Sequence, residues 1–297
     1  MIGVDWGTSS FRAFRLGADG RVAERRAAPR GILAIENGRF AEELLRQTGD
    51  WIADGETRVL MAGMVGSRQG WVEAPYLACP AGPAEIATAL VRVPFEGAEL
   101  LLVPGLTHTD AAGTPEVMRG EETQLVGVLG ELGADGIACL PGSHSKWAHI
   151  AAGRIAGFAT YLSGEAFAAL RGHTILGRMM QDGPTDPAAF DRGVARSGDP
   201  GHLLHHLFGV RTLGLFGRLA ETESASYLSG LLIGHEVRAA LPTTGATVHL
   251  IGAEPLCALY TRAIIACGAT AVTHDEDAAA SGLARIGKDA PWTPMPN

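Results

Sequence analysis

The sequence predicts an α/β protein with two similar domains, each built on a mixed sheet flanked by helices. The chain has 297 residues, enough for about two domains of roughly 150 residues each. Apolar runs of strand length alternate with amphipathic runs of helix length. A hairpin-like stretch near residue 5 also recurs near residue 140, and a repeat at half-chain distance is typical of two related domains. We therefore expect a first domain at residues 1–134 and a second at residues 135–297.

The composition is that of a folded protein and argues against two classes of partner. Hydrophobic residues make up 46% of the chain and charged residues 19%, so large cores can form. The net charge of −8 lacks the basic footprint of a nucleic-acid-binding protein, although a local basic pocket for a small anion is compatible with it. No apolar run reaches the roughly 18 residues that a membrane span needs. We expect neither nucleic acid nor a membrane as partner.

The first residues and the cysteines predict a cytoplasmic protein. Met1 leads directly into an apolar strand pattern, without the basic and apolar regions of a signal peptide. The cysteines show no Cys-x-x-Cys spacing, which indicates reduced thiols. They are Cys79, Cys139, Cys257 and Cys267.

The N-terminal stretch predicts a strand, a tight turn and an antiparallel return strand. Gly7 allows the backbone to approach a ligand closely. Thr8, Ser9 and Ser10 offer N–H groups and hydroxyls to an anion such as a phosphate. Asp5, where the strand enters the turn, can hold a divalent metal directly or through water. An ordinary hairpin with a polar turn is the alternative interpretation.

The first half then continues with alternating elements. We expect an extended segment at Arg21–Pro29, a helix at Phe40–Ala53, strands at Thr57–Met61 and Leu100–Val103, and a helix beyond Gly120 within Glu116–Leu132. The strand ending at Met61 enters a glycine-containing loop at 62–68, where a ligand would lie if the sheet is parallel there. The segment Thr107–Pro115 is polar and is expected to be mobile.

Near residue 133 the pattern starts again. Aligning Gly142 on Gly7 places Ser143 on Thr8, and Ser145 and Ala148 fall on Ser10 and Ala13. Leu140 replaces Asp5, so any acidic role belongs to the first copy alone. The match indicates one supersecondary unit used twice; chance similarity between two hairpins is the alternative.

The second half predicts further strands and helices. We expect strands at Ile137–Leu140, Gly157–Tyr161, Thr247–Ile251 and Ala269–Thr273, and helices at Gly164–Leu176, Ser224–Leu241, Leu256–Cys267 and Asp277–Ile286. Gly177–Gly201 is a polar segment rich in Gly and Pro. His202, His205 and His206 have helical spacing and are expected at the surface, since no carboxylate motif nearby supports a metal site.

Small residues follow one stripe of the helix at Ser224–Leu241, among them Ser229 and Gly230. They allow close approach of another helix or of a flat ligand. Gly252 and Ala253 then form a strand–Gly–helix junction, which brings N–H groups and a helix N-terminus to the edge of a ligand. Any α/β protein has several such junctions, so this one is weak by itself.

Taken together, these motifs resemble those of the 2-dehydro-3-deoxygalactonokinase family, within the sugar kinase, hexokinase and actin superfamily. The matching stretches span nearly the whole chain in order: Val4–Thr8, Met61–Trp71, Ala74–Leu77, Pro104-Gly105, Val117–Gly127, Pro141–Trp147, Ser163–Glu165, His173–Gly177 and Tyr227–Gly234. Val117–Gln124 and Pro141–Trp147 are long enough to be specific. The turn Ile251–Glu254 departs from the superfamily pattern, which usually has a second glycine there.

The resemblance implies two RNase-H-like domains with ATP in the cleft between them, and transfer of the γ-phosphoryl group to the 6-hydroxyl of 2-dehydro-3-deoxy-D-galactonate. Asp5 would be a catalytic residue that organises Mg²⁺ through water. The second hairpin has no equivalent acid, because Leu140 stands at that position. The implied phosphate ligands are Gly7, Thr8, Ser9, Gly142, Ser143, His144 and Lys146. The implied adenosine-side residues are Ser229, Gly230, Gly252 and Ala253. For Lys146, a hairpin lysine facing solvent is an equal alternative.

The resemblance implies a catalytic base at Glu121 or Glu122, the position where kinases of the superfamily carry it. Without the resemblance, two adjacent glutamates are typical of a solvated first helical turn. Neighbouring side chains on a helix diverge by about 100°, so only one of the two can point to the substrate. We favour Glu121, beside Gly120. The substrate is a carboxylate, for which Arg12, Arg68 and Arg119 are the candidate cations. The expected wall of the acceptor site comprises Met64, Val65, Gly66, Ser67, Trp71 and Tyr76, of which the two aromatic residues can equally be core residues.

Two other functions stay open from the sequence. One is a kinase of the same fold that acts on a neutral hexose or another keto-deoxy sugar acid. The other is a non-catalytic sugar or nucleotide sensor, against which the retained acids Asp5 and Glu121 or Glu122 speak. The choice between the galactonate and gluconate epimers, and the oligomeric state, have no visible signature in the residues.

Overall fold

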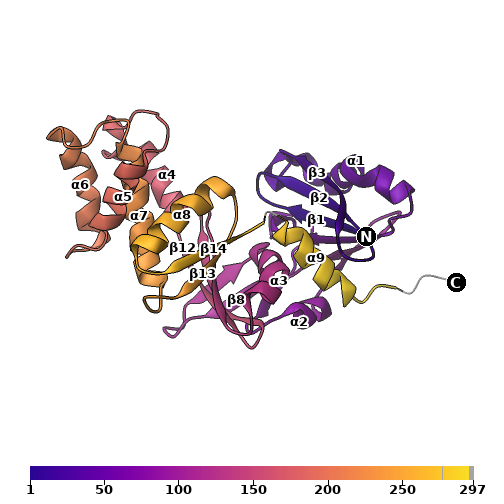
Figure 1. Cartoon of the computed structure of the whole chain (residues 1–297). Helices are drawn as coiled ribbons and strands as arrows, with labels where there is room; N and C mark the ends of the chain where they lie inside the picture. Colours follow the sequence, from indigo (N-terminus) through magenta and orange to yellow (C-terminus); the bar gives the residue numbers. More distant parts are fainter. Residues whose placement is uncertain (276, 294–297) are drawn as a thin grey trace. The chain divides into compact units, whose positions relative to one another are not determined.

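The computed structural model describes residues 1–275 and 277–293, and its contacts divide the chain into two compact units (Figure 1). Unit 1 comprises Met1–Gly136, Ala148–Ala159 and the C-terminal segment from Asp275. Unit 2 comprises Ile137–Trp147 and Thr160–His274. The sequence predicts a domain boundary near residue 134, close to the end of the first segment of unit 1. Both units are discontinuous in the chain, because unit 1 also includes Ala148–Ala159 and the segment from Asp275.

Unit 1 is built on a six-stranded mixed sheet. Its order is β3-β2-β1-β4-β7-β6, with bounds Val22–Ala28, Phe11–Leu16, Ile2–Trp6, Arg58–Ala62, Glu99–Leu102 and Val91–Val93. Strands β1 and β2 pair antiparallel, with Asp5 opposite Arg12, which confirms the predicted N-terminal hairpin. Strand β4 runs parallel to both β1 and β7, so the carboxyl ends of these three strands share one edge.

Helices and a small sheet complete unit 1. They are α1 (Phe40–Ala53), α2 (Pro83–Thr88), α3 (Glu121–Leu132) and α9 (Ala278–Lys288), with the sheet β5-β8-β9 formed by Tyr76–Ala78, Gly105–Thr109 and Pro115–Met118. Helices α3 and α9 lie side by side (Figure 1). They approach through glycine: a Cβ on Gly127 would lie 2.0 Å from the Ala278 carbonyl oxygen, and one on Gly282 would lie 1.8 Å from that of Thr123. This close packing is why α9 belongs to unit 1.

The second large sheet repeats the strand order of the first. It runs β12-β11-β10-β13-β14, with bounds Arg154–Tyr161, Ser145–Ala151, Gly136–Leu140, Thr247–Ile251 and Thr270–His274. The corresponding order in unit 1 is β3-β2-β1-β4-β7, and in both sheets the fourth strand is parallel to its neighbours. The internal repeat seen at the two hairpins therefore extends over five strands. The predicted α/β class with mixed sheets and flanking helices is confirmed.

Unit 2 also contains a group of helices packed on one another (Figure 1). They are α4 (Ser163–His173), α5 (Pro187–Arg196), α6 (Leu203–Leu215), α7 (Ser224–Ala240) and α8 (Glu254–Ala266). Helix α7 is largely buried and packs against α5, where a Cβ on Gly230 would lie 2.0 Å from the Phe190 carbonyl oxygen. The small-residue stripe on α7 thus serves helix packing at Gly230.

Three local features go beyond what the sequence predicts. Thr107–Pro115 contains parts of β8 and β9 around a turn, in which the Asp110 side chain accepts hydrogen bonds from the N–H groups of Ala112 and Thr114. The polar segment Gly177–Gly201 contains α5, capped by the Asp186 carboxylate, which accepts from the Ala189 N–H. Both devices are local and visible in the sequence.

The third feature concerns the histidines of α6. His202 and His205 are exposed as expected, but His206 is completely buried and its Nδ1 lies 3.0 Å from Nε2 of His235. In the part of the chain that the structure describes, no three His, Cys, Asp or Glu side chains gather as a metal site. No helix among the described residues is long and apolar enough to cross a membrane.

Candidate active site

The carboxyl ends of β1 and β4 and the start of α3 bring the predicted acids of unit 1 together. Gly63 follows β4 with φ 96°, and a Cβ there would lie 2.7 Å from the Trp6 carbonyl oxygen and 3.2 Å from Oδ1 of Asp5. Gly120, with φ 106°, precedes α3, and a Cβ on it would lie 3.2 Å from Cα of Gly63. Only glycine allows this approach at such φ values. The backbone thus holds Asp5 near the N-terminus of α3.

Asp5 is 8% exposed and forms an ion pair across the hairpin with Arg12. Nη2 of Arg12 donates to Oδ2 of Asp5 over 2.5 Å. The cross-strand pairing of these two residues places them on the same face of the sheet. Arg12, one of the three candidates for the substrate carboxylate, is therefore bound to Asp5 instead.

The two adjacent glutamates occupy different environments. Glu122 is completely buried, and its two oxygens accept from the Gly120 N–H over 2.7 Å and from the Thr123 hydroxyl over 3.0 Å. Burial, followed by the neighbouring charge of Glu121, raises the pKa of Glu122 to about 7. Glu121 is partly exposed and accepts from the Arg119 N–H over 2.9 Å. Of the two, Glu121 is the one that a substrate can reach.

The loop after β4 carries the predicted acceptor wall. Val65 is completely buried in the main core of unit 1, and Trp71 packs there between Phe40 and Phe95. Met64 and Gly66 form the short 3₁₀ turn with Val65, and Met64 also packs on this core. For Trp71, the contacts are those of a core aromatic residue.

The remaining arginine candidates differ in burial. The Arg68 side chain is 87% exposed and lies 3.5 Å from Glu73. Arg119 is 8% exposed, with its guanidinium carbon 4.4 Å from the centre of the Tyr76 ring and Nη2 donating to the Ala74 carbonyl oxygen over 2.7 Å. Arg119 alone of the three is a buried cation without a carboxylate partner among the described residues.

The second hairpin, which the sequence predicts to bind phosphate, is held from two sides. His144 in its turn is paired with Glu165 of α4, and the Ser143 carbonyl oxygen accepts from the Glu165 N–H. Lys146 is only 6% exposed and donates to the Thr160 hydroxyl over 2.9 Å. The alternative of a solvent-facing lysine is therefore wrong.

A network of buried side-chain hydrogen bonds lies below this hairpin, and no sequence motif predicted it. Glu236 of α7, 3% exposed, accepts from Nε1 of Trp147 and from the hydroxyl of Tyr260, each over 2.8 Å. The Tyr260 hydroxyl also lies 2.7 Å from the hydroxyl of Ser145. Burial raises the pKa of Glu236. A carboxylate inside an otherwise apolar helix pattern was the available signal.

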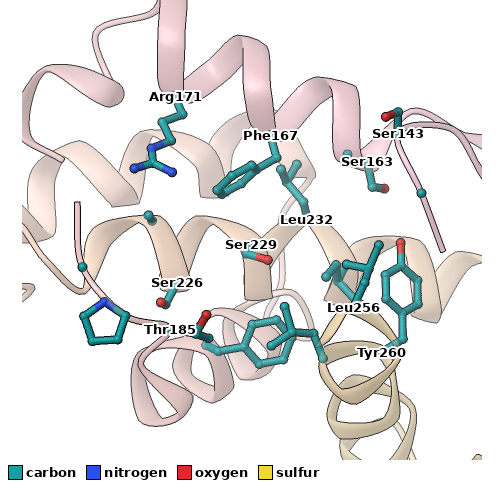
Figure 2. Close-up of a pocket in the computed structure, with 18 of the residues that line it drawn as sticks. Ser143, Ser163, Phe167, Arg171, Thr185, Ser226, Ser229, Leu232, Leu256 and Tyr260 are labelled. Atoms are coloured by element: carbon teal, nitrogen blue, oxygen red, sulfur yellow. The ribbon is translucent and has the colours of Figure 1, made fainter. Parts of the chain in front are cut away.

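A cavity of about 630 Å³ lies within unit 2 beside the same hairpin (Figure 2). Ser143 and Tyr260 lie toward one end, Arg171 toward the other, and Ser229 and Leu232 of α7 lie between them (Figure 2). The predicted residues Gly142, Ser143 and Ser229 line this cavity. Ser226, another small residue of the α7 stripe, also lines it. Lining residues that the sequence did not suggest include Ser163, Phe167, Thr185, Leu256 and Tyr260.

Three of the four predicted adenosine-side residues are not among those that line this cavity. Gly230 faces the backbone of α5, as described above. Gly252 and Ala253 form the junction between β13 and α8, four and three residues before Leu256, which lines the cavity. Ala253 is exposed. The phosphate candidates Thr8 and Ser9 are exposed in the turn of the first hairpin, beside the half-buried Gly7.

Comparison with known proteins identifies relatives along nearly the whole chain. A Rhizobium meliloti (strain 1021) protein named as a probable 2-dehydro-3-deoxygalactonokinase is 39% identical over 93% of this chain and 92% of its own length. The 2-dehydro-3-deoxygalactonokinase of Escherichia coli (strain K12) is 35% identical over 92% of this chain and 93% of its own length.

Solved structures agree with this result. A crystal structure from Sinorhizobium meliloti, provisionally assigned the same activity, has a TM-score of 0.88 and 36% identity, covering 97% of this chain and 98% of that one. The ADPNP-bound activator of the 2-hydroxyisocaproyl-CoA dehydratase from Clostridium difficile has a TM-score of 0.52 and 12% identity, covering 97% and 95%, and shows the fold alone. The model of the 2-keto-3-deoxy-galactonokinase family matches residues 5–286, and the chain belongs to that family.

Proposed function

We propose that this protein is an ATP-dependent kinase that phosphorylates the primary 6-hydroxyl of 2-dehydro-3-deoxy-D-galactonate. Family membership and the names of both relatives support this substrate. The structural observation that carries the proposal is the grouping of Asp5 with the start of α3, where Glu121 and Glu122 stand, by the close approach of Gly63 to Gly120. A carboxylate for a metal and a carboxylate for a base are the two acids that phosphoryl transfer needs.

Unit 2 is proposed to bind the nucleoside. The cavity has the volume of a small-molecule site and combines apolar walls with hydroxyl groups. Phe167 and Leu256 offer faces for the adenine ring, and Ser226, Ser229 and Thr185 offer hydrogen bonds to the base or ribose. The hairpin residues Gly142, Ser143 and Lys146 would then contact phosphate groups, with His144 held by Glu165. The expected location of ATP between the domains stays a prediction from the sequence.

Unit 1 is proposed to bind the metal and the acceptor. Mg²⁺ is usually held by one or two carboxylates together with phosphate and water oxygens, so the single carboxylate of Asp5 fits it. When bound, Mg²⁺ neutralises phosphate charge. Arg12 fixes the orientation of Asp5 through their ion pair. The turn residues Gly7, Thr8 and Ser9 would donate to phosphate oxygens.

Glu121 is proposed as the base that takes the proton from the 6-hydroxyl. Its partial exposure allows contact with a substrate, whereas Glu122 is buried and bonded to Gly120 and Thr123. Glu122 would instead hold the first turn of α3. Neutralising a general base typically costs about 10²–10⁴-fold in rate.

The test is steady-state release of ADP with 2-dehydro-3-deoxy-D-galactonate and ATP·Mg²⁺, beside the gluconate epimer and a panel of neutral hexoses. We expect turnover of the galactonate, and a loss of about 10²–10⁴-fold in kcat for Glu121→Gln. Preference for a neutral hexose would support the second kinase function, and binding of sugar and ATP without ADP release would support a sensor. If Glu122→Gln alone lost turnover with its fold intact, the base would be Glu122.

A further inference from the structure

Buried hydrogen-bond donors without partners lie in the acceptor region of unit 1. Among the described residues, Nε and Nη1 of Arg119 and the hydroxyl of Ser67 have no hydrogen-bond partner, although these atoms are buried. Arg119 as a whole is 8% exposed. Buried polar groups are nearly always hydrogen-bonded, and leaving one unpaired is energetically costly, most of all when it is charged. Such a group in a folded protein calls for a ligand.

The surroundings fix the guanidinium of Arg119 firmly in place. Its Nη2 is bonded to the Ala74 carbonyl oxygen, and the Tyr76 ring covers one face. Tyr76 is itself held by Gly105, since a Cβ on that glycine would lie 2.7 Å from the ring. Gly66 lies against Nη1, because a Cβ there would be 3.1 Å from that nitrogen. Ser67 directly follows Gly66 in the chain. The partnerless hydroxyl of Ser67 and the partnerless nitrogens of Arg119 therefore belong to two segments that are in contact at Gly66.

We propose that Arg119 and Ser67 bind the carboxylate of the sugar-acid substrate and thereby make the enzyme select acids over neutral sugars. The inference rests on the proposed function and adds the residues that decide its substrate class. The partnerless guanidinium nitrogens can only donate hydrogen bonds, so they need an acceptor, and the Ser67 hydroxyl can donate to the same group. A carboxylate accepts hydrogen bonds from several donors at once. A neutral hexose leaves the buried cation without a counter-charge, which is an energetic penalty against the wrong substrate.

The same segment connects this anion site to the proposed base. The Arg119 N–H donates to Oε2 of Glu121, two residues farther along the chain. The side chain of Arg119 therefore anchors one end of the acceptor while its backbone orients the carboxylate of Glu121. Anchoring a remote group of the substrate is an established way to position the reacting hydroxyl.

The experiment compares 2-dehydro-3-deoxy-D-galactonate with its primary amide, a neutral analogue of nearly the same shape. For the unmodified enzyme we expect kcat/KM to be at least about tenfold higher for the acid, since a charged hydrogen bond is worth about 1.5–3 kcal/mol. Arg119→Lys keeps the charge but loses the planar fork. We expect it to raise KM for the acid about 10–100-fold, to reduce the preference over the amide, and to leave KM for ATP unchanged.

Ser67→Ala is the sharper variant, because its hydroxyl has no protein hydrogen bond to lose. We expect KM for the acid to rise about three- to tenfold with an unchanged Tm. Thr261→Val is the matched control: its Oγ1 is also buried and partnerless, but it lies on α8 in unit 2. That control is expected to leave KM for the acid and the acid-to-amide ratio unchanged.

The outcomes separate this inference from the proposed function. If the unmodified enzyme phosphorylates the acid and both variants keep its acid-to-amide ratio, the anion site is wrong and the kinase function stands. If the enzyme binds the acid in calorimetry without phosphorylating it, the kinase function is wrong. In that case weaker or absent binding by Arg119→Lys and Ser67→Ala still supports the anion site, and binding as tight as that of the unmodified enzyme overturns it.

Discussion

The hairpin β1–β2 of unit 1 and the hairpin β10–β11 of unit 2 occupy the same place in equivalent sheets. Each turn also rests on a glycine three residues beyond the third strand of its sheet. A Cβ on Gly31 would lie 2.3 Å from the Thr8 carbonyl oxygen, and one on Gly164 would lie 2.5 Å from that of Gly142. Strands β3 and β12 end at Ala28 and Tyr161, which sets this common spacing.

The hairpins differ in where their carboxylate comes from. In unit 1, Asp5 belongs to the hairpin itself and is paired with Arg12 of the return strand. In unit 2, the equivalent position is the buried Leu140, and the carboxylate is Glu236 of α7, which holds Trp147. An acid on the hairpin is available to a ligand, whereas an acid below the hairpin fixes its position. In the function proposed above, one scaffold thus serves once for chemistry and once for binding.

The largest effect on kcat is expected from removing the carboxylate that distinguishes the first hairpin from the second. Asp5→Asn makes the first hairpin uncharged at this position, as the second is. We expect kcat to fall about 10²–10³-fold, the scale for losing one electrostatic group from an active site. Steady-state kinetics measures the loss, with Asp54→Asn, an exposed surface change, as control. Turnover within threefold of the unmodified enzyme would remove Asp5 from the mechanism.

A polar and an apolar substitution at position 236 together test whether Glu236 anchors the second hairpin. Glu236→Leu leaves the Trp147 N–H unpaired and removes the acceptor of the Tyr260 hydroxyl, which keeps only Ser145 as partner. This should cost about 2–5 kcal/mol of unfolding free energy and raise KM for ATP. Glu236→Gln still accepts from Trp147 and can donate to the Tyr260 hydroxyl, which then donates to Ser145. Urea unfolding and ATP kinetics should therefore show substantial rescue. Equal effects of both substitutions would contradict the anchor role.

The buried carboxylate of Glu122 should make the stability of the protein depend on pH. The pKa of Glu122 is about 7 in the folded protein and near 4.5 in the unfolded chain. Between these values the unfolded chain releases its proton first, so rising pH favours unfolding, by roughly 3 kcal/mol in total. Glu122→Gln has no proton to release. Urea unfolding should therefore show that the stability of the variant, relative to that of the unmodified protein, increases as pH rises from 4.5 to 7.5. If the two proteins have parallel curves of unfolding free energy against pH, Glu122 does not titrate in this way.

The smallest effects are expected at the glycines beneath the turns. Gly31→Ala and Gly164→Ala place a methyl group against backbone atoms and should each cost about 1–3 kcal/mol. Gly49→Ala in α1 and Gly172→Ala in α4 are matched controls, because nothing lies within 4 Å of a Cβ at either site. These helix-interior changes should stabilise slightly. Differential scanning calorimetry measures all four, and a neutral Gly164→Ala would show that the second turn is not tightly supported.

Much of the fold could be predicted because it depends on local patterns. The helix at Phe40–Ala53 and the strand at Thr247–Ile251 match their predicted bounds. Helix α5 was missed, although Asp186 and Pro187 form a recognisable helix start. The grouping of α9 with unit 1 could not be predicted, because it depends on backbone contacts between glycines of α3 and α9 that have no local signature.

The sequence by itself determined the strand–helix order, the repeated hairpin, the family motifs and the position of Asp5 in only one copy. The tertiary structure decided which of several chemically equal residues is suited to which task. It paired Arg12 with Asp5, exposed Arg68, and buried Arg119 with donors unsatisfied. It also buried Glu122 while leaving Glu121 accessible, and supplied Glu236 from a distant helix. Burial and hydrogen-bond partners arise from contacts between segments far apart in the chain, which a residue's type and spacing do not specify.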